Sequence, residues 1–169
     1  MDAMSPADAE VALRSLGRRF RSAVASAASD DETGDDLAHR SGPDGASVID
    51  HLAATVGGLS VFDHALERVR TSDRPTLHPG VLDPSQRDFA VQVTGPALSL
   101  DEALLDLDVA AGRLADRVSE TPASDWTRSA SLAGGNQTAR AIDLVRQAVT
   151  ESIERLRAVE HTLKAVRGA

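Results

Sequence analysis

Four stretches of the chain repeat apolar side chains at steps of three and four residues, the spacing that places them along one side of an α-helix. The stretches cover residues 6–27, 48–70, 100–118 and 139–167. Each is about 20 to 28 residues long, and each therefore predicts a helix whose single apolar face must be buried against other elements. The pattern restricts the chain to helices packed on helices and predicts an all-α fold.

Three of the four predicted helices begin with a serine followed three residues later by an acid. The pairs are Ser5 with Asp8, Ser47 with Asp50, and Ser99 with Glu102. At the N-cap, the residue just before a helix, the serine hydroxyl accepts from a backbone N–H, and the acid reaches back to the serine. Only the third pair has the full capping-box sequence, because its acid is glutamate. The aspartates of the first two pairs are favoured near the positive end of a helix, but less specifically. These pairs mark three helix starts.

The connection between the second and third predicted helices, residues 71–99, is long and rich in proline. Antiparallel neighbours need only a short turn, whereas parallel neighbours require the chain to travel back about 30 Å along a helix. We therefore expect a four-helix bundle in up-down-down-up order, with a long crossover between its second and third helices. "FAVQV" at 89–93 alternates like a strand, but a single strand makes no sheet, and we interpret it as ordered loop.

Composition limits the classes of function. The 169 residues predict one domain, 1–169, and the formal net charge of −8 disfavours nucleic acid and anionic membranes as partners. The absence of cysteine excludes disulfides, thiolate metal sites and cysteine nucleophiles. No apolar run is long enough for a membrane span or a signal sequence, so a cytoplasmic protein is expected. The Ala-, Arg- and Asp-rich composition is typical of a high-GC bacterium.

Charged residues cluster at two places near the N-terminus. The first predicted helix carries arginines outside its apolar stripe, at Arg14, Arg18, Arg19 and Arg21. Two interpretations stay open: a solvated face, which exposed helices often have, or a patch that binds anions. The acidic run "SDDETGDD" at 29–36 lacks the ligand spacing of an EF-hand and is interpreted as a solvated linker.

Polar residues at the edges of the apolar stripes are the candidates for chemistry. His51 lies beside the stripe of the second helix, and Asp63 lies near its centre, where it caps an interior polar network or marks the end of the packed region. Thr150 and Glu154 lie four residues apart, on one face of the fourth helix. Glu151 is turned by about 100° from Thr150 and is expected to be exposed.

Several segments together resemble the DinB-like superfamily, in particular its actinobacterial members. They are "PDGASVIDHLA" before and within the second helix, "SDRPTL" after it, "TPASDWT" after the third, and "TARAIDLVRQAVTESIERLR" in the fourth. The superfamily includes damage-inducible DinB proteins and the N-terminal domain of mycothiol-dependent maleylpyruvate isomerase. The resemblance implies a four-helix bundle of the topology expected above.

The resemblance also implies a divalent metal, zinc or nickel, held by a histidine near the start of the second helix and by two residues four apart on the fourth. His51 matches the first ligand, and Glu154 and Thr150 fall on the other two positions. Arg155 follows, where relatives often carry a histidine, and its charge would pair with Glu154. A catalytic zinc needs about three protein ligands, and a threonine hydroxyl is a poor one. A metal-depleted site is therefore favoured.

The resemblance, taken with these residues, implies two functions. The first is a non-catalytic or metal-depleted DinB-like protein with a small-molecule pocket between helices, for which the candidates are Asp63, Thr150, Glu151 and Arg155. The alternative is a metal-dependent transferase of a low-molecular-weight thiol such as mycothiol, or a hydrolase, acting on a small molecule. Whether the protein is an enzyme stays open, and association into a homodimer is a third expectation.

Overall fold

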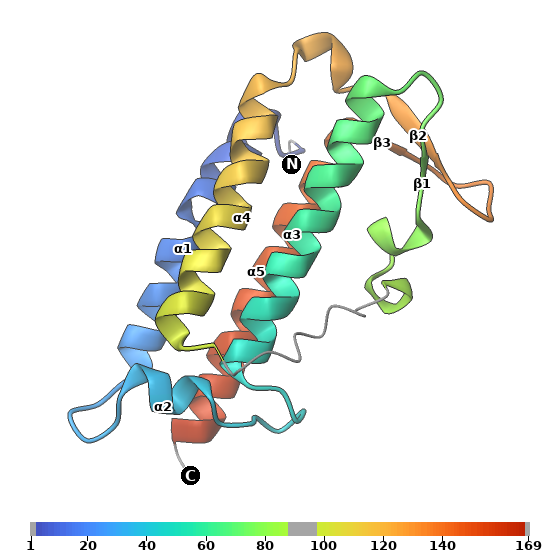
Figure 1. Ribbon diagram of the computed structural model, residues 1–169. Helices are drawn as coiled ribbons and strands as arrows, with labels where there is room; N and C mark the ends of the chain where they lie inside the picture. Colours follow the sequence, from blue (N-terminus) through green and yellow to red (C-terminus); the bar gives the residue numbers. More distant parts are fainter. Residues whose placement is uncertain (1–2, 88–97, 168–169) are drawn as a thin grey trace.

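The computed structural model of the protein describes residues 3–87 and 98–167. Four long helices dominate it (Figure 1): α1 (Pro6–Ala27), α3 (Val48–Thr71), α4 (Leu100–Glu120) and α5 (Ala141–Arg167). Their ends agree with the predicted helices to within two residues. The prediction of a predominantly helical chain is therefore confirmed.

The serine and acid pairs close the starts of α1, α3 and α4 as predicted. At α4, the backbone N–H of Glu102 donates to Ser99 Oγ at 3.2 Å, and the N–H of Ser99 donates to Glu102 Oε2 at 2.9 Å. Hydrogen bonds from the backbone N–H and the hydroxyl of Ser99 to the Glu102 carboxylate hold the pKa of that carboxyl below its usual value. The aspartates at α1 and α3 form the same reciprocal pairs, so the shorter acid serves equally well here.

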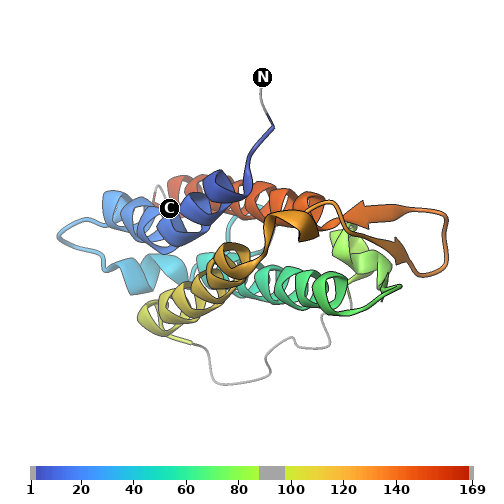
Figure 2. The same cartoon turned by 90° about the horizontal axis from the view of Figure 1, so that it is seen from above.

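The long helices form two layers. In Figure 1, α1 and α5 run downward and α3 and α4 run upward. Each helix packs on its neighbour in the same layer and on one helix of the other layer: α1 contacts α5 and α4, and α3 contacts α4 and α5. Figure 2, turned by 90°, shows α1 and α5 on one side of the molecule and α3 and α4 on the other.

The apolar stripes meet between these layers. The largest fully buried side chains include Leu13, Phe20, Leu52, Leu59, Phe62, Leu66, Leu107, Leu114 and Leu144. Burial of one such side chain contributes about 1.5–3 kcal/mol, so the stripes are sufficient reason for the helices to assemble. Val56 of α3 and Ile153 of α5 are only partly buried and pack against this core from its edge. No helix among the described residues is both long and apolar enough to cross a membrane.

A small sheet departs from the all-α prediction. β1 (Thr76–Leu77) pairs in parallel with β2 (Ser129–Leu132), and β2 pairs antiparallel with β3 (Thr138–Arg140). The hairpin between β2 and β3 turns through Gly134, whose φ of 80° favours glycine. Three short 3₁₀ turns, Pro79–Val81, Pro84–Gln86 and Ala123–Asp125, complete the connections. The predicted loop at 89–93 lies outside the described residues.

A fifth helix corrects the interpretation of residues 29–36 as a solvated linker. α2 (Gly34–Ala38) begins within that acidic run, where Thr33 Oγ1 accepts from the backbone N–H of Asp36 at 3.1 Å. Its Leu37 side chain is fully buried. The acidic residues therefore lie at the start of a helix, where their charge interacts favourably with its positive end. The same helix places the apolar Leu37 in the core.

α2 is joined to the start of α4 by polar contacts. Asp35 Oδ1 accepts from the backbone N–H of Leu100 at 2.8 Å. The two ring nitrogens of His39 lie 2.7 Å from the carbonyl oxygen of Asp35 and 2.9 Å from that of Leu98. Because both partners are acceptors, both nitrogens donate only when the ring is protonated. These hydrogen bonds raise the pKa of His39 above its usual value.

Candidate functional site

His51, the residue matching a family metal ligand, lies in the first turns of α3. Its side chain is 4% exposed. Nε2 lies 3.4 Å from Thr162 Oγ1 on α5 and 3.7 Å from Asp44 Oδ2 in the loop before α3. Burial lowers the pKa of His51 below its usual value; Asp44 opposes this shift and Arg155 adds to it. The fold therefore favours a neutral imidazole that faces a hydroxyl.

The other two family positions do not lie beside His51. Thr150 is exposed, and its Oγ1 donates to the backbone carbonyl of Arg146 at 2.9 Å. Glu154 is also exposed. Thr162, which does contact His51, follows Glu154 by eight residues, or about 12 Å along the helix axis. The structure thus brings His51 together with Thr162 and Asp44 and leaves Thr150 and Glu154 at the surface.

The donors around His51 fit a divalent metal poorly. One imidazole, one threonine hydroxyl and one carboxylate that is 59% exposed do not amount to the three strong ligands that zinc needs. Within residues 3–87 and 98–167, no three His, Asp or Glu side chains are grouped so that they could hold a metal ion. Arg155 is partly buried and places a positive charge near His51, which further disfavours a cation there.

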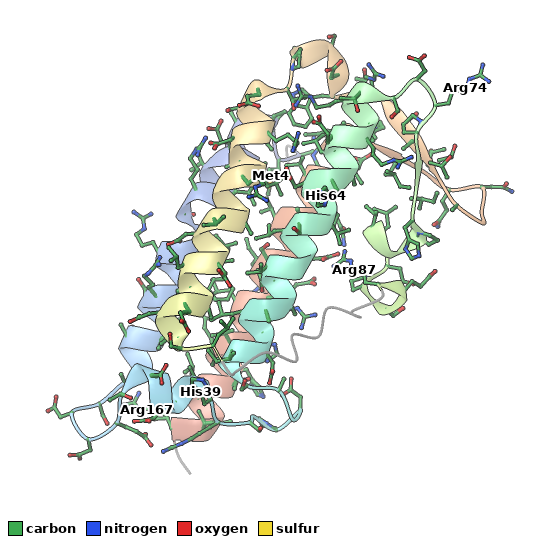
Figure 3. All side chains as sticks on the ribbon, viewed as in Figure 1. Met4, His39, His64, Arg74, Arg87 and Arg167 are labelled. Carbon is green, nitrogen blue, oxygen red and sulfur yellow. The ribbon has the colours of Figure 1, made fainter. Side chains whose placement is uncertain are left out.

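Glu151, expected to be exposed, is instead largely buried in an ion pair. Arg87 Nη1 and Nη2 donate to its two carboxylate oxygens at 2.7 and 2.9 Å. Arg87 also donates from Nε to the Gly80 carbonyl at 2.6 Å and lies over the Phe62 ring, with its guanidinium carbon 5.1 Å from the centroid. Figure 3 labels Arg87 between α3 and the 3₁₀ turns. Glu151 therefore fixes the chain after α3 to α5, and its carboxylate is occupied.

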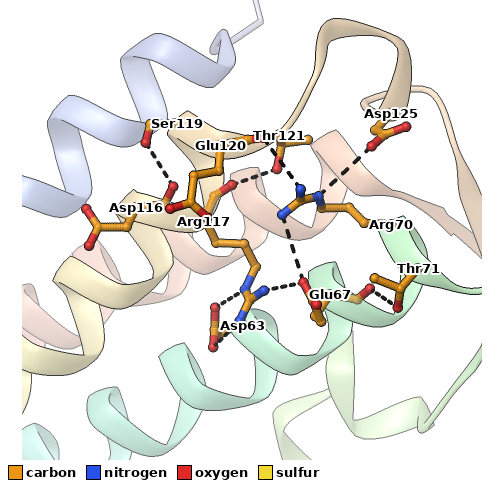
Figure 4. Close-up of polar contacts among 10 residues, drawn as sticks. All are labelled: Asp63, Glu67, Arg70, Thr71, Asp116, Arg117, Ser119, Glu120, Thr121 and Asp125. Carbon is orange, nitrogen blue, oxygen red and sulfur yellow. Dashed lines mark hydrogen bonds and ion pairs between the residues drawn. The ribbon is translucent and has the colours of Figure 1, made fainter.

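Asp63 takes the first of its two predicted roles, in an interior polar network (Figure 4). Its oxygens accept from Arg117 Nε at 2.5 Å and Nη2 at 3.2 Å. Arg117 also pairs with Glu67, and Arg70 Nη1 lies 3.9 Å from the same carboxylate. The hydrogen bond from Arg117 to Asp63 raises the pKa of that guanidinium. The network joins α3 to α4, and Asp63 is satisfied within it.

The arginines of α1 divide into two pairs. Arg14 Nη2 lies 2.9 Å from Asp116 Oδ1, and Arg21 Nη2 lies 2.6 Å from Asp108 Oδ2, so both join α1 to α4. The other two, Arg18 and Arg19, line a groove between α1 and α5. Among the residues that the structure describes, neither forms an ion pair or a side-chain hydrogen bond.

The groove between α1 and α5 has a volume of about 520 Å³ and is open to solvent along its length. From α1 it is lined by the two arginines, Ser22, Ser26 and two alanines. From α5 it is lined by Leu156, Glu160, Leu163, Lys164 and Arg167. Arg167 is labelled at the lower end of α5 in Figure 3. Four cations and one carboxylate make the groove positive in a chain whose net charge is −8.

Comparison of the chain with family models, with curated proteins and with solved structures finds no match in any of the three.

Most of the groove residues could not be predicted from the sequence of each helix taken alone. Glu160, Lys164 and Arg167 are spaced by four and three residues, which places them on one face of α5. This spacing could have predicted a charged face on α5. Which neighbouring helix this face meets depends on how α1 and α5 pack, and no local pattern encodes the packing.

Proposed function

We propose that the chain is a DinB-like helical domain without a catalytic metal, whose function is to bind a small molecule in the groove between α1 and α5. The order and directions of the long helices support the DinB-like part, because two helices run in parallel across a long connection. The resemblance of residues 43–53 and 138–157 supports it as well. A bundle of this kind carries its binding sites between facing helices.

The arrangement around His51 supports a non-catalytic role. Its Nε2 faces Thr162, while the two other family positions are exposed. The remaining pocket candidates are engaged elsewhere, Asp63 with Arg117 and Glu151 with Arg87. The polar residues that the family uses for chemistry therefore act here as packing and clamping groups.

The observation that carries the proposal is the groove itself. Its volume of about 520 Å³ lies within the range of about 300–1,000 Å³ that small-molecule sites occupy. Its cations have no partner among the described residues, whereas Arg14 and Arg21 on the same helix are paired with α4. A ligand would supply the missing partners.

A substitution that fills the groove tests the proposal. Ser26 is exposed and lines the groove, so Ser26→Trp places an indole inside it without disturbing the core. Ala25→Trp is the matched control, because Ala25 is exposed on the same turn but does not line the groove. A library of charged and neutral metabolite-sized compounds is screened by ligand-observed NMR.

We expect at least one compound to bind the natural sequence and the Ala25→Trp variant but not the Ser26→Trp variant. Compounds that bind all three proteins equally, or a library without any binder, would contradict the proposal. Metal content of untagged protein is measured in parallel. Stoichiometric zinc or nickel retained through purification would instead favour the metal-dependent transferase or hydrolase.

A further inference from the structure

We propose that the ligand of the α1/α5 groove is an elongated small molecule with an anionic group at each end and a hydrogen-bond donor between them. The inference rests on the proposed function, since it names the class of molecule that the same groove takes. It follows from the order of charges along the groove, which the packing of the two helices determines.

The two helices run in the same direction, so residues early in each segment lie at one end of the groove (Figure 1). Arg18 and Arg19 open the α1 segment, and Lys164 and Arg167 close the α5 segment. The lining therefore has one pair of cations toward each end. The α1 segment from 18 to 27 spans about 14 Å and the α5 segment from 156 to 167 about 17 Å. A molecule that satisfies both ends must be extended.

Carboxylate or phosphate groups suit these ends. An arginine fork binds either group through two parallel hydrogen bonds, and lysine adds a point charge. None of the four cations is paired with a carboxylate among residues 3–87 and 98–167. The net negative charge of the chain disfavours long polyanions such as nucleic acid, which would meet acidic surface beyond the groove. A compact anion avoids that repulsion.

The middle of the groove requires different chemistry. Glu160 precedes Lys164 by one helical turn and is the one acid in the lining. Its carboxylate repels a third anionic group and accepts a hydrogen bond from a hydroxyl or an ammonium. Leu156 and Leu163 lie on the same face and give the groove an apolar floor. The preferred ligand therefore has an apolar backbone with a central donor.

A ligand series tests this pattern by calorimetry at low salt. Butanedioate, hexanedioate, octanedioate and decanedioate vary the separation of the two carboxylates. Octane-1,8-diol keeps the length without the charge, and a central amino derivative of the best diacid adds the donor. A diphosphorylated chain of the same length distinguishes phosphate from carboxylate preference.

We expect affinity to rise with length to an optimum among the longer diacids, and the diol to bind at least about tenfold more weakly. Arg19→Gln and Lys164→Gln should each weaken the best diacid by about fivefold, since each removes one exposed ion pair. Arg113→Gln is the matched control: this α4 arginine is outside the groove and has no ion pair among the described residues. Its loss should leave the affinity unchanged.

The Glu160→Gln variant tests the role of the acid in the middle of the groove separately from that of the cations at its ends. The variant should bind plain diacids more tightly, because a repulsive charge is lost, and the amino derivative less tightly, because its acceptor is weakened. Equal effects of Arg19→Gln and Arg113→Gln, or equal binding of diol and diacid, would overturn the inference. If the diol binds and Ser26→Trp abolishes its binding, the groove still takes a small molecule and only the charge pattern fails.

Discussion

Replacement of Arg87 by methionine tests whether the clamp between the chain after α3 and α5 stabilises the fold. Arg87 is 6% exposed and its partner Glu151 is 14% exposed at the side chain. The guanidinium makes two bonds to Glu151 and further bonds to the carbonyls of Gly80 and Val81. Methionine keeps the length and the contact with Phe62 but leaves the carboxylate and both carbonyls without this donor.

The expected loss follows from burial. Removal of one member of a buried ion pair destabilises a protein by about 3–5 kcal/mol, because the other charge stays buried and unpaired. Gln147 Nε2, 3.2 Å from Glu151 Oε1, keeps one hydrogen bond to the carboxylate. We therefore expect a loss of about 3 kcal/mol, at the lower end of this range.

Urea unfolding followed by circular dichroism measures the effect. The control is Arg14→Met, which breaks the pair with Asp116, whose side chains are 45% and 62% exposed, and a surface pair with Glu10 one turn away. Such a pair contributes at most about 1 kcal/mol, so the control should change stability little. The double variant Arg87→Met with Glu151→Met should lose less than the two single losses added together. A loss with Arg87→Met no larger than with Arg14→Met would refute the clamp.

Three further predictions concern titration and packing. The raised pKa of His39 means that its contribution to stability is full below about pH 6.5, the unfolded value, and disappears as pH rises through the folded value. The difference in free energy of unfolding between the natural chain and His39→Gln should therefore shrink on going from acid to alkaline buffer. A constant difference would contradict a protonated His39 in the folded state. The lowered pKa of His51 has the opposite sign: stability falls as pH decreases from about 6.5 through the folded value, and His51→Leu should remove this acid sensitivity in urea titrations. A Cβ at Gly17 would lie 1.9 Å from Asp108 Oδ1, so Gly17→Ala must displace that carboxylate and loses the exposed Arg21–Asp108 pair, which offsets the helix propensity that alanine adds. Gly112→Ala, with nothing within 4 Å, has no such loss and should raise the melting temperature more than Gly17→Ala does. Equal rises in the two variants would refute the close contact.

The long helices were predictable because their signals are local. A stripe of apolar residues and a serine three positions before an acid lie within a single segment, and both act on that segment. The sheet has no such signal. β1 and β2 contribute two and four residues, and they pair across more than fifty positions of sequence. An alternation of apolar and polar residues over so short a segment does not distinguish a strand from a loop.

The candidate site was predictable only in part, for a related reason. The interior network of Asp63 was one of two expected roles, since a carboxylate in an apolar stripe needs a buried partner. The spacing of Thr150 and Glu154 was correct for one helix face. Their position relative to His51 depends on the register between α3 and α5, which places Thr162 opposite His51 instead. Register between helices is a property of the packed core and not of either sequence segment.

The arginines of α1 show the same division. Their presence left open a solvated face or an anion patch, and the fold assigns the two pairs differently. Arg14 and Arg21 meet aspartates of α4, while Arg18 and Arg19 join the cations of α5. Helical periodicity places each side chain around its own axis, but the neighbour it meets is decided by tertiary packing.

The central claim, that the α1/α5 groove binds a small anion, is tested most directly by an NMR titration of ¹⁵N-labelled protein with octanedioate. We predict saturable shifts of backbone amides confined to residues 18–27 and 156–167, together with their loss in the Ser26→Trp variant. Shifts centred on His51 and the start of α3, or no saturable shift at all, would contradict the account.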